Sequence, residues 1–234
     1  MTDVRAELER LADEKYRSFH SRLLPGTENI LGVRVPDLWK LARKLVKEER
    51  DGYLRRASDE TYEEIMLQGM VISLIKESFE EKLSRLPAYM KKIDNWAQCD
   101  VVCSRLRMCE KNREATLGFL KPYLESEKEF EVRFAVVLLM NYLTDEDYID
   151  ETLSLLESVK HPGYYVKMGV AWTVSVCFVK FPEKTMDCLK RGNFDRDTYG
   201  KALQKIVESN RVSPETKTVI REMRREQRQK KTDA

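Results

Sequence analysis

Apolar side chains recur at spacings of three and four residues along almost the whole chain. Leu8 and Leu11 follow this spacing near the start, and Leu38, Leu41 and Leu45 follow it again. A period near 3.6 residues is typical of amphipathic α-helices. Only nine glycines and seven prolines interrupt the pattern. The chain is therefore predicted to be all-α.

Residues that favour helix starts recur at a nearly constant interval. When the starts are placed at positions 60, 94, 127, 161 and 195, the intervals are 34, 33, 34 and 34 residues. Intervals of this length are typical of helix–turn–helix repeats. They predict an α-solenoid of the HEAT-like type, with about six stacked antiparallel helix pairs and a concave groove suited to binding. An irregular helical bundle is the alternative.

A single helical-repeat domain over residues 1–234 is the simplest organisation for a chain of this length. Residues 221–231 contain six Lys or Arg and two Glu. We expect residues 222–234 to form a frayed basic tail, and a solvated final helix or a weak DNA contact are the alternatives. The uncharged run at 168–179 is too short to span about 30 Å of hydrocarbon and is predicted to be a buried helix.

The overall charge does not announce a nucleic-acid partner. Lys and Arg total 42 against 40 Asp and Glu, so the formal net charge is +2. Any basic surface therefore requires segregation of charge. The amino-terminal segment is charged from its third residue and resembles neither a secretory signal nor an anchor. We expect a cytoplasmic monomer.

No metal or organic cofactor is expected. Cys99, Cys103 and Cys109 have no nearby histidine to complete a zinc site. All five cysteines are predicted to be small core residues in a reducing compartment. No phosphate-binding glycine loop or hydrolase motif occurs. We expect His20 to be an exposed helix residue, and His161 to be a capping or loop residue rather than a base.

Charges recur at one offset within the predicted repeats. The residues six positions after the five starts are Met66, Asp100, Arg133, Lys167 and Lys201. If these positions face the groove, one carboxylate lies at the end of a cationic row that can hold a phosphodiester backbone. Solvated helix faces are the alternative, because 35% of the residues are charged.

Tryptophans adjoin this row. Trp96 precedes Asp100 by four residues, so the indole and the carboxylate share a helix face. Trp172 follows Lys167 by five residues and points about 140° away from it, so both cannot be central. Trp39 lies in an ordinary amphipathic helix and is predicted to be a core residue. A core position is also the alternative for Trp96 and Trp172.

The order and spacing of these residues resemble those of the AlkD-type DNA alkylation-repair glycosylases. The resemblance covers most of the chain and rests on Trp96, Asp100, Arg133, Trp172 and the Gly-Val-Arg-Val-Pro segment at 32–36. It implies a HEAT-like solenoid that holds duplex DNA in a basic concave groove. It also implies excision of cationic N3- or N7-alkylated purines without a metal or organic cofactor.

Two positions depart from the family pattern. Asn95 stands where a second aromatic residue is common, and Phe130 stands where tryptophan is common. These departures concern the detail of the groove rather than the central set. The amino-terminal helix, including Tyr16, Arg17 and His20, matches too loosely for any DNA contact to be assigned to it.

The resemblance also implies a role for each central residue. The carboxylate of Asp100 would stabilise an oxocarbenium-like sugar and orient water toward C1′. The two indoles would flank the deoxyribose of the lesion, where cation–π attraction favours the cationic sugar, and the arginine would bind phosphate. The candidates are Asp100, Trp96 and Trp172 for catalysis, and Arg133, Lys167 and Lys201 for DNA binding.

Two other hypotheses remain open from the sequence. The first is a catalytically silent DNA-binding relative, which would share the basic groove and retain Asp100 without excising bases. The second is a helical-repeat scaffold for protein partners, which an apolar concave face would favour. Release of free base from methylated duplex DNA distinguishes the enzyme from both.

Overall fold

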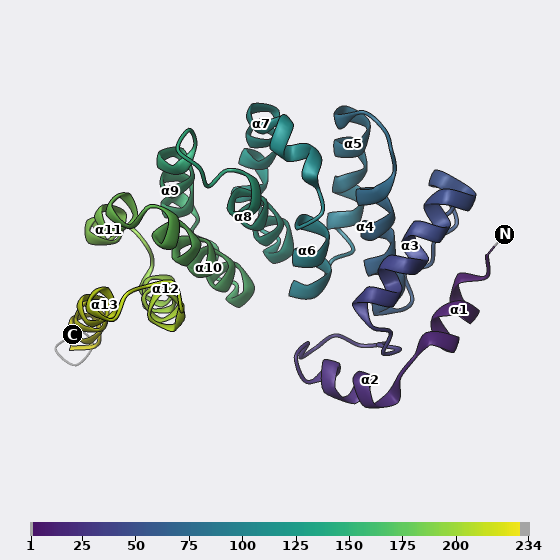
Figure 1. Cartoon of the computed structure of the whole chain (residues 1–234), viewed down its shortest axis with the longest axis horizontal. Coiled ribbons are helices and arrows are strands. Elements are labelled where there is room, and N and C mark those ends of the chain that lie inside the picture. The colour runs from purple at the N-terminus through teal and green to yellow at the C-terminus, as the bar shows by residue number, and fades with distance from the viewer. Residues whose placement is uncertain (1, 230–234) are drawn as a thin grey trace. The chain divides into compact units, whose positions relative to one another are not determined.

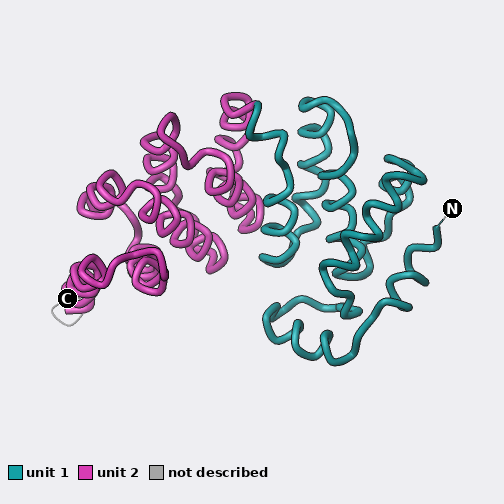
Figure 2. The backbone as a smooth tube through the Cα atoms, viewed as in Figure 1, with its two compact units in different colours: residues 1–111 teal, residues 112–234 magenta. Residues whose placement is uncertain are grey.

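The computed structural model describes residues 2–229 and confirms an all-helical protein. Thirteen α-helices and two short 3-10 helices make up the described part of the chain, which contains no strand. The chain divides into two compact units, Met1–Lys111 and Asn112–Ala234 (Figure 2). The prediction of a single repeat domain stays a prediction. No helix within the described range is both long and apolar enough to cross a membrane.

Unit 1 holds the helices drawn from purple to teal in Figure 1. They are α1 (Val4–Leu11), α2 (Glu14–Ser21), α3 (Val35–Glu49), η1 (Arg50–Gly52), α4 (Tyr62–Leu74), α5 (Phe79–Met90), α6 (Trp96–Cys103) and η2 (Arg107–Lys111).

Unit 2 holds the helices drawn from green to yellow. They are α7 (Arg113–Leu124), α8 (Glu129–Tyr142), α9 (Ile149–Ser158), α10 (Tyr164–Lys180), α11 (Pro182–Arg191), α12 (Arg196–Glu208) and α13 (Pro214–Gln229).

The predicted helix starts are confirmed to within three residues. Helices α4, α6, α8, α10 and α12 begin at residues 62, 96, 129, 164 and 196, so the intervals are 34, 33, 35 and 32 residues. Such regular spacing is typical of repeated helix pairs. The solenoid arrangement of those pairs stays a prediction.

Side-chain caps explain why several helices begin where they do. Thr61 and Glu64 form a reciprocal capping box at the start of α4, and Ser78 and Glu81 form another at the start of α5. Each box satisfies backbone N–H groups that have no partner within the helix. These polar starts are visible in the sequence, which is why the interval could be predicted.

Each unit has its own apolar core. In unit 1, α1, α3 and α4 pack around fully buried residues such as Leu8, Leu45 and Met66. In unit 2, α8 and α10 lie side by side and contribute about half of the buried side chains (Figure 1). Most of the run 168–179 is buried within α10, as predicted. The five cysteines are all buried and free, which confirms their assignment to the core.

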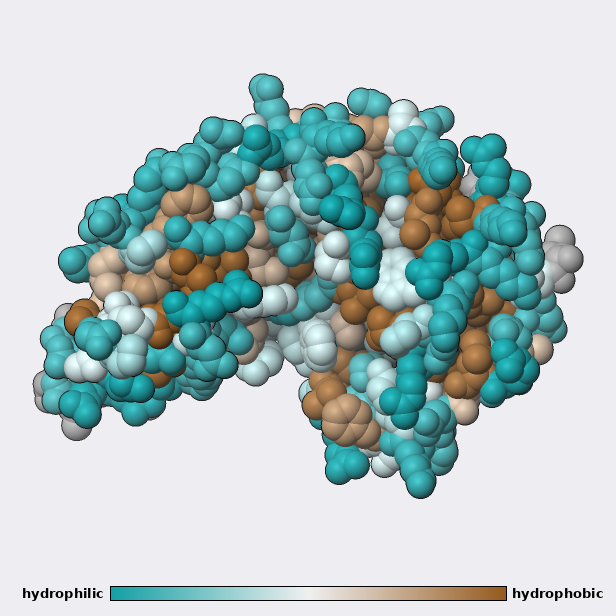
Figure 3. Space-filling model, in the orientation of Figure 1, coloured by the Kyte–Doolittle hydropathy of each residue, from teal (hydrophilic) through white to brown (hydrophobic). Residues whose placement is uncertain are grey.

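Trp39 lies at the edge of the unit 1 core. Its ring is partly buried against the apolar cluster, and the guanidinium carbon of Arg105 lies 5.4 Å from the ring centroid. The core prediction therefore holds for one side of this indole. On the face drawn in Figure 3, hydrophilic side chains predominate, and apolar patches lie between them in both units. Phe19 of α2 and Leu23, just after that helix, are exposed apolar residues of unit 1.

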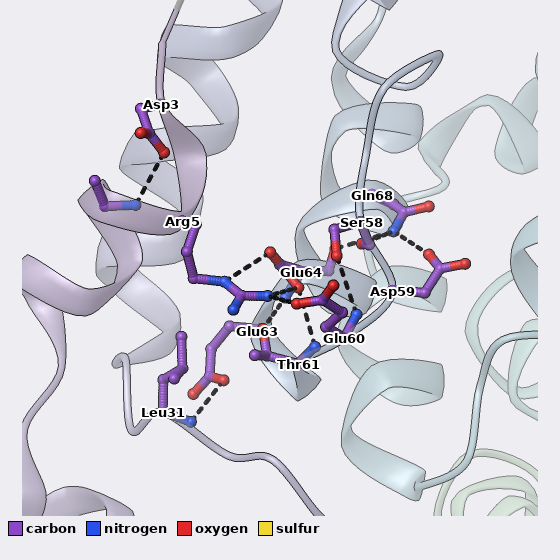
Figure 4. Close-up of polar contacts among 11 residues, drawn as sticks. Asp3, Arg5, Leu31, Ser58, Asp59, Glu60, Thr61, Glu63, Glu64 and Gln68 are labelled. Atoms are coloured by element: carbon purple, nitrogen blue, oxygen red, sulfur yellow. Dashed lines mark hydrogen bonds and ion pairs between the residues drawn. The ribbon is translucent and has the colours of Figure 1, made fainter.

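A buried carboxylate fixes the loop before α3. Glu63 is fully buried and accepts hydrogen bonds from the backbone N–H groups of Leu31, Gly32 and Val33 at 2.9, 2.7 and 3.0 Å. Gly32 has φ of +93°, and a Cβ there would lie 2.6 Å from Cβ of Arg17. Only glycine fits this position without strain. Part of the contact is drawn in Figure 4.

An ion-pair cluster joins α1 to α4 in the same unit. Arg5 donates to both carboxylate oxygens of Glu64, at 3.0 and 2.8 Å, and to Glu60 at 2.8 Å (Figure 4). Bidentate pairing of this kind is geometrically specific as well as strong. The amino-terminal helix is therefore held in place by charge as well as by Leu8.

The two histidines differ in outcome. The prediction that His20 is exposed is wrong: it is 7% exposed, and its Nε2 lies 3.1 Å from the hydroxyl of Tyr62. Its ring also stacks on Tyr16, so α2 turns this face toward α4 rather than toward solvent. The prediction for His161 is confirmed, because its Nδ1 accepts from the backbone N–H of Gly163 in the loop before α10.

The expected frayed tail is helical over part of its length. Helix α13 continues to Gln229, so residues 222–229 belong to it. Residues 230–234 lie outside the described part of the chain. The alternative of a solvated final helix applies to the described part, because only Ile220 of α13 is buried.

Candidate functional site

Trp96 and Asp100 lie on one face of α6 in unit 1. Asn95 caps this helix, and its side-chain oxygen accepts from the backbone N–H groups of Ala97 and Gln98, each at 3.0 Å. The residue that departs from the family pattern therefore positions the first turn of α6. That turn carries Trp96, and Asp100 follows one turn later.

The two faces of α6 differ in accessibility. The core-facing residues are buried, and they are Ala97, Gln98, Cys99, Val102 and Cys103. Trp96 and Asp100 are both partly exposed, and Ser104 continues the same face in the open. The structure thus brings the predicted carboxylate and indole together where a ligand can reach them.

Trp96 is held in a fixed orientation. Its indole N–H donates to the carbonyl oxygen of Leu23 at 3.0 Å, and its ring packs against the edge of the unit 1 core. The core interpretation of this residue therefore holds for part of the ring, and its contact with a ligand stays a prediction. The hydrogen bond links α6 to the end of α2.

Arg133 is not an exposed cation. It is 5% exposed within α8, and its Nη1 donates to the carbonyl oxygen of Tyr165 at 2.6 Å. The side chain lies against Gly169 of α10, where an added Cβ would be 3.5 Å from Nη1. Met66, at the same offset in α4, is fully buried. Arg133 and Met66 are therefore both buried, and the groove-facing position of the row Asp100, Arg133, Lys167 and Lys201 stays a prediction.

Lys167 lies in the first half of α10, and Lys201 lies in the first half of α12. The ammonium of Lys167 is 3.0 Å from Asp197 and 3.3 Å from Asp195. The hydrogen bond that this ammonium donates to the Asp197 carboxylate raises the pKa of Lys167. Lys201 lies with its ammonium 4.9 Å from the ring centroid of the exposed Tyr164. The charge of Lys167 is therefore paired with carboxylates of the protein, whereas the ammonium of Lys201 contacts an aromatic ring.

Trp172 lies farther along α10, apart from Lys167. It is 36% exposed and lines a pocket of about 300 Å³ between α10 and α12. Both Lys167 and Trp172 have neighbours at or near α12, and the prediction that they diverge around α10 stays a prediction. Sequence reasoning missed the basic residues of this pocket, which are Lys180, Lys205 and Arg211. Lys205 was detectable, because it follows Lys201 by one helical turn.

The candidate residues therefore form two sets, one in each unit. Trp96 and Asp100 belong to unit 1, and the remaining candidates belong to unit 2. The cysteines add no reactive group: burial raises the pKa of both Cys177 and Cys188 to about 12, so these thiols are neutral near pH 7. Within residues 2–229, no cluster of three or more His, Cys, Asp or Glu side chains could hold a metal ion.

Comparison with known families identifies the family of the chain. Residues 4–180 match the family described as DNA alkylation repair enzyme, and the chain belongs to that family. The match includes Asp100, Arg133 and Trp172, and it ends with α10, before Lys201. No curated protein matches the chain. Membership supports an enzyme of DNA alkylation repair, with DNA as its substrate.

Proposed function

We propose that this protein is a monofunctional DNA glycosylase that removes cationic N3- or N7-alkylated purines from duplex DNA. The observation that carries the proposal is the accessible face of α6, which presents Asp100 one turn from Trp96 in a member of a DNA alkylation repair family. A carboxylate beside an aromatic ring suits a developing sugar cation.

The proposed reaction is hydrolysis of the N-glycosidic bond. The bond between C1′ and the purine nitrogen breaks, and the electron pair leaves with the base, which becomes neutral because it began as a cation. The sugar develops oxocarbenium character, which the Asp100 carboxylate stabilises by its charge. Water then adds to C1′ and gives up a proton to the carboxylate or to solvent. This reaction needs no cofactor.

The two tryptophans support the same step in the proposal. The resemblance assigns both indoles to the deoxyribose of the lesion, where ring faces attract positive charge. Because Trp96 is fixed by its bond to Leu23, its ring needs no reordering when the cation forms. Trp172 is more exposed than Trp96.

The proposed DNA contacts come from the cations of unit 2. The resemblance assigns Arg133 to a phosphate, and the shared offset adds Lys167 and Lys201. Lys201 supports this assignment best, because no carboxylate within the described chain pairs with it. Arg133 and Lys167 are already engaged by Tyr165 and by two aspartates. We also propose that the protein is a monomer and that it acts in the cytoplasm.

Base release tests this function directly. The purified chain is incubated with duplex DNA that carries 7-methylguanine or 3-methyladenine, and free base is separated and quantified against spontaneous depurination. We expect release well above that background. Absence of release together with salt-sensitive binding would identify a silent DNA-binding relative. Absence of both release and binding would favour a scaffold for protein partners.

A further inference from the structure

The pocket beside Trp172 is a basic opening next to a candidate site residue. It has a volume of about 300 Å³ and lies wholly within unit 2. Lys180 at the end of α10, Lys205 of α12 and Arg211 of the following loop line it with Trp172. One carboxylate, that of Glu208, lies on the same wall.

The charges of this pocket are available to a ligand. The ammonium of Lys180 is hydrogen bonded to the carbonyl and hydroxyl oxygens of Thr144, at 3.1 and 2.8 Å, and both acceptors are neutral. No carboxylate within residues 2–229 forms an ion pair with Lys205 or Arg211. Glu208 instead accepts from the side-chain amide of Gln204 at 2.7 Å. The pocket is therefore lined by three cations and one carboxylate.

The contrast with the predicted cations favours this pocket. A phosphate that binds Lys167 must compete with two aspartates, and one that binds Arg133 must reach a side chain that is 95% buried. Breaking existing charged contacts costs free energy that a phosphate contact has to offset. No such contact has to be broken at Lys205 or Arg211.

The position of Lys205 also suits an extended anion. It follows Lys201 by four residues, so both side chains share one face of α12 and are separated by a rise of about 6 Å. A DNA strand presents a series of phosphates, so two cations along one helix can contact neighbouring phosphates. Helix α12 lies beyond residues 4–180, the part of the chain that matches the family.

We propose that the pocket next to Trp172 is a DNA-backbone subsite in which Lys205 and Arg211 bind phosphodiester groups, with Lys180 as a third cation. This proposal rests on the proposed function, since it supplies the phosphate contacts that a DNA glycosylase needs. It places the main electrostatic anchor of unit 2 on α12 and the loop after it, rather than on Arg133 and Lys167.

Salt-dependent binding tests the subsite. Affinity for an undamaged duplex is measured by fluorescence anisotropy between 50 and 200 mM salt for wild type and for Lys205→Ala with Arg211→Ala. Each lost phosphate contact lowers the slope by about 0.9, so the affinity of wild type should fall about tenfold more than that of the variant over this range.

A matched control separates a local contact from a general loss of charge. Lys190→Ala with Arg225→Ala removes the same charge from exposed positions on α11 and α13. It should preserve most of the wild-type slope. An equal reduction by both double variants would overturn the local assignment. Thermal unfolding of each variant checks the fold, and Lys205→Gln with Arg211→Gln replaces any alanine variant that unfolds.

Chemical neutralisation of the DNA gives a second test that needs no further protein variant. Each duplex carries a single methylphosphonate, placed at successive positions around 7-methylguanine. The affinity of each duplex is measured for wild type and for the Lys205 and Arg211 double variant. At one or two of these positions, we expect the methylphosphonate to weaken binding by wild type and to leave binding by the double variant unchanged. If the two proteins respond alike everywhere, the subsite is wrong. If wild type binds no duplex at all, the proposed function itself fails.

Discussion

The two units present their candidate residues in different ways. In unit 1, Asp100 and Trp96 lie on a partly exposed face of one helix, α6. In unit 2, two of the three predicted cations, Arg133 and Lys167, are occupied by the protein's own carbonyl and carboxylate groups. The third, Lys201, pairs with no carboxylate among the described residues, and Lys205 and Arg211 are further cations that were not predicted.

This difference shows what helical spacing can determine. Spacing places Trp96 and Asp100 on one face because both belong to one helix. An equal offset in successive helices does not place residues on one surface, because each helix can rotate about its own axis. Met66 and Arg133 share the offset of Asp100, yet both are buried. The shared face of Trp96 and Asp100 follows from the geometry of one helix, whereas the burial of Arg133 depends on contacts with residues far away in the sequence.

The largest expected effect on stability concerns the anchor of unit 1. Glu63→Ala leaves three backbone N–H groups of the loop before α3 without their acceptor. We expect a loss of about 3–5 kcal/mol in the free energy of unfolding, since buried donors without partners are costly. Urea unfolding followed by circular dichroism measures it. A loss below about 1 kcal/mol would show that solvent or another group satisfies these donors.

Arg133→Ala tests whether this residue belongs to the protein or to the DNA site. Because Arg133 is buried and donates to Tyr165, we expect the free energy of unfolding to fall by about 2–4 kcal/mol. The salt slope of DNA binding should change little in the fraction that remains folded. A stable variant whose slope falls by about 0.9 would restore the phosphate assignment.

The tryptophans extend the comparison to catalysis. Trp96→Ala and Trp172→Ala should each slow base release about 5- to 30-fold, as expected for the loss of 1–2 kcal/mol of cation–π stabilisation. Trp96→Ala should also lose more stability, because its indole packs on the core and bonds to Leu23. Single-turnover release and thermal unfolding are measured on both. Trp96→Phe, which keeps an aromatic ring, should recover part of the rate. Equal losses of rate and of affinity would indicate simple docking instead.

The smallest effect concerns the pH dependence of unit 1. Burial lowers the pKa of His20, so the unfolded chain binds a proton more readily than the folded one. Stability from this group is complete above the ordinary histidine pKa near 6.5 and decreases as the pH falls below it. His20→Gln should therefore flatten the decline in unfolding free energy between about pH 7.5 and pH 5. An unchanged decline would show that other groups cause it.

The sequence predicted those features that depend on local spacing. The all-α class, the helix starts and the buried run at 168–179 all follow from periodicity and capping residues. The burial of His20 and Arg133 could not be predicted, because their partners Tyr62 and Tyr165 lie 42 and 32 residues away. The ion pairs of Lys167 were hidden for the same reason, although its charge was plain.

The pairing of Asp100 with Trp96 was predictable, but its chemistry was not settled by position. Side chains one turn apart on a helix share a face in any sequence, whether or not they act on a ligand. The resemblance to repair glycosylases supplied the proposed role, and the structure adds that the face is accessible. The remaining step is to measure what the charge of this carboxylate does.

The most direct test of the central claim is single-turnover release of 7-methylguanine from duplex DNA by Asp100→Asn. This substitution removes the charge and keeps the shape, so affinity for undamaged duplex should be similar or higher. Release should fall by about 10²–10³-fold, the effect of removing one preorganised electrostatic group. Asp187→Asn, an exposed aspartate of α11, serves as the matched control and should release base at the wild-type rate. Release by Asp100→Asn within about threefold of wild type would contradict the catalytic assignment.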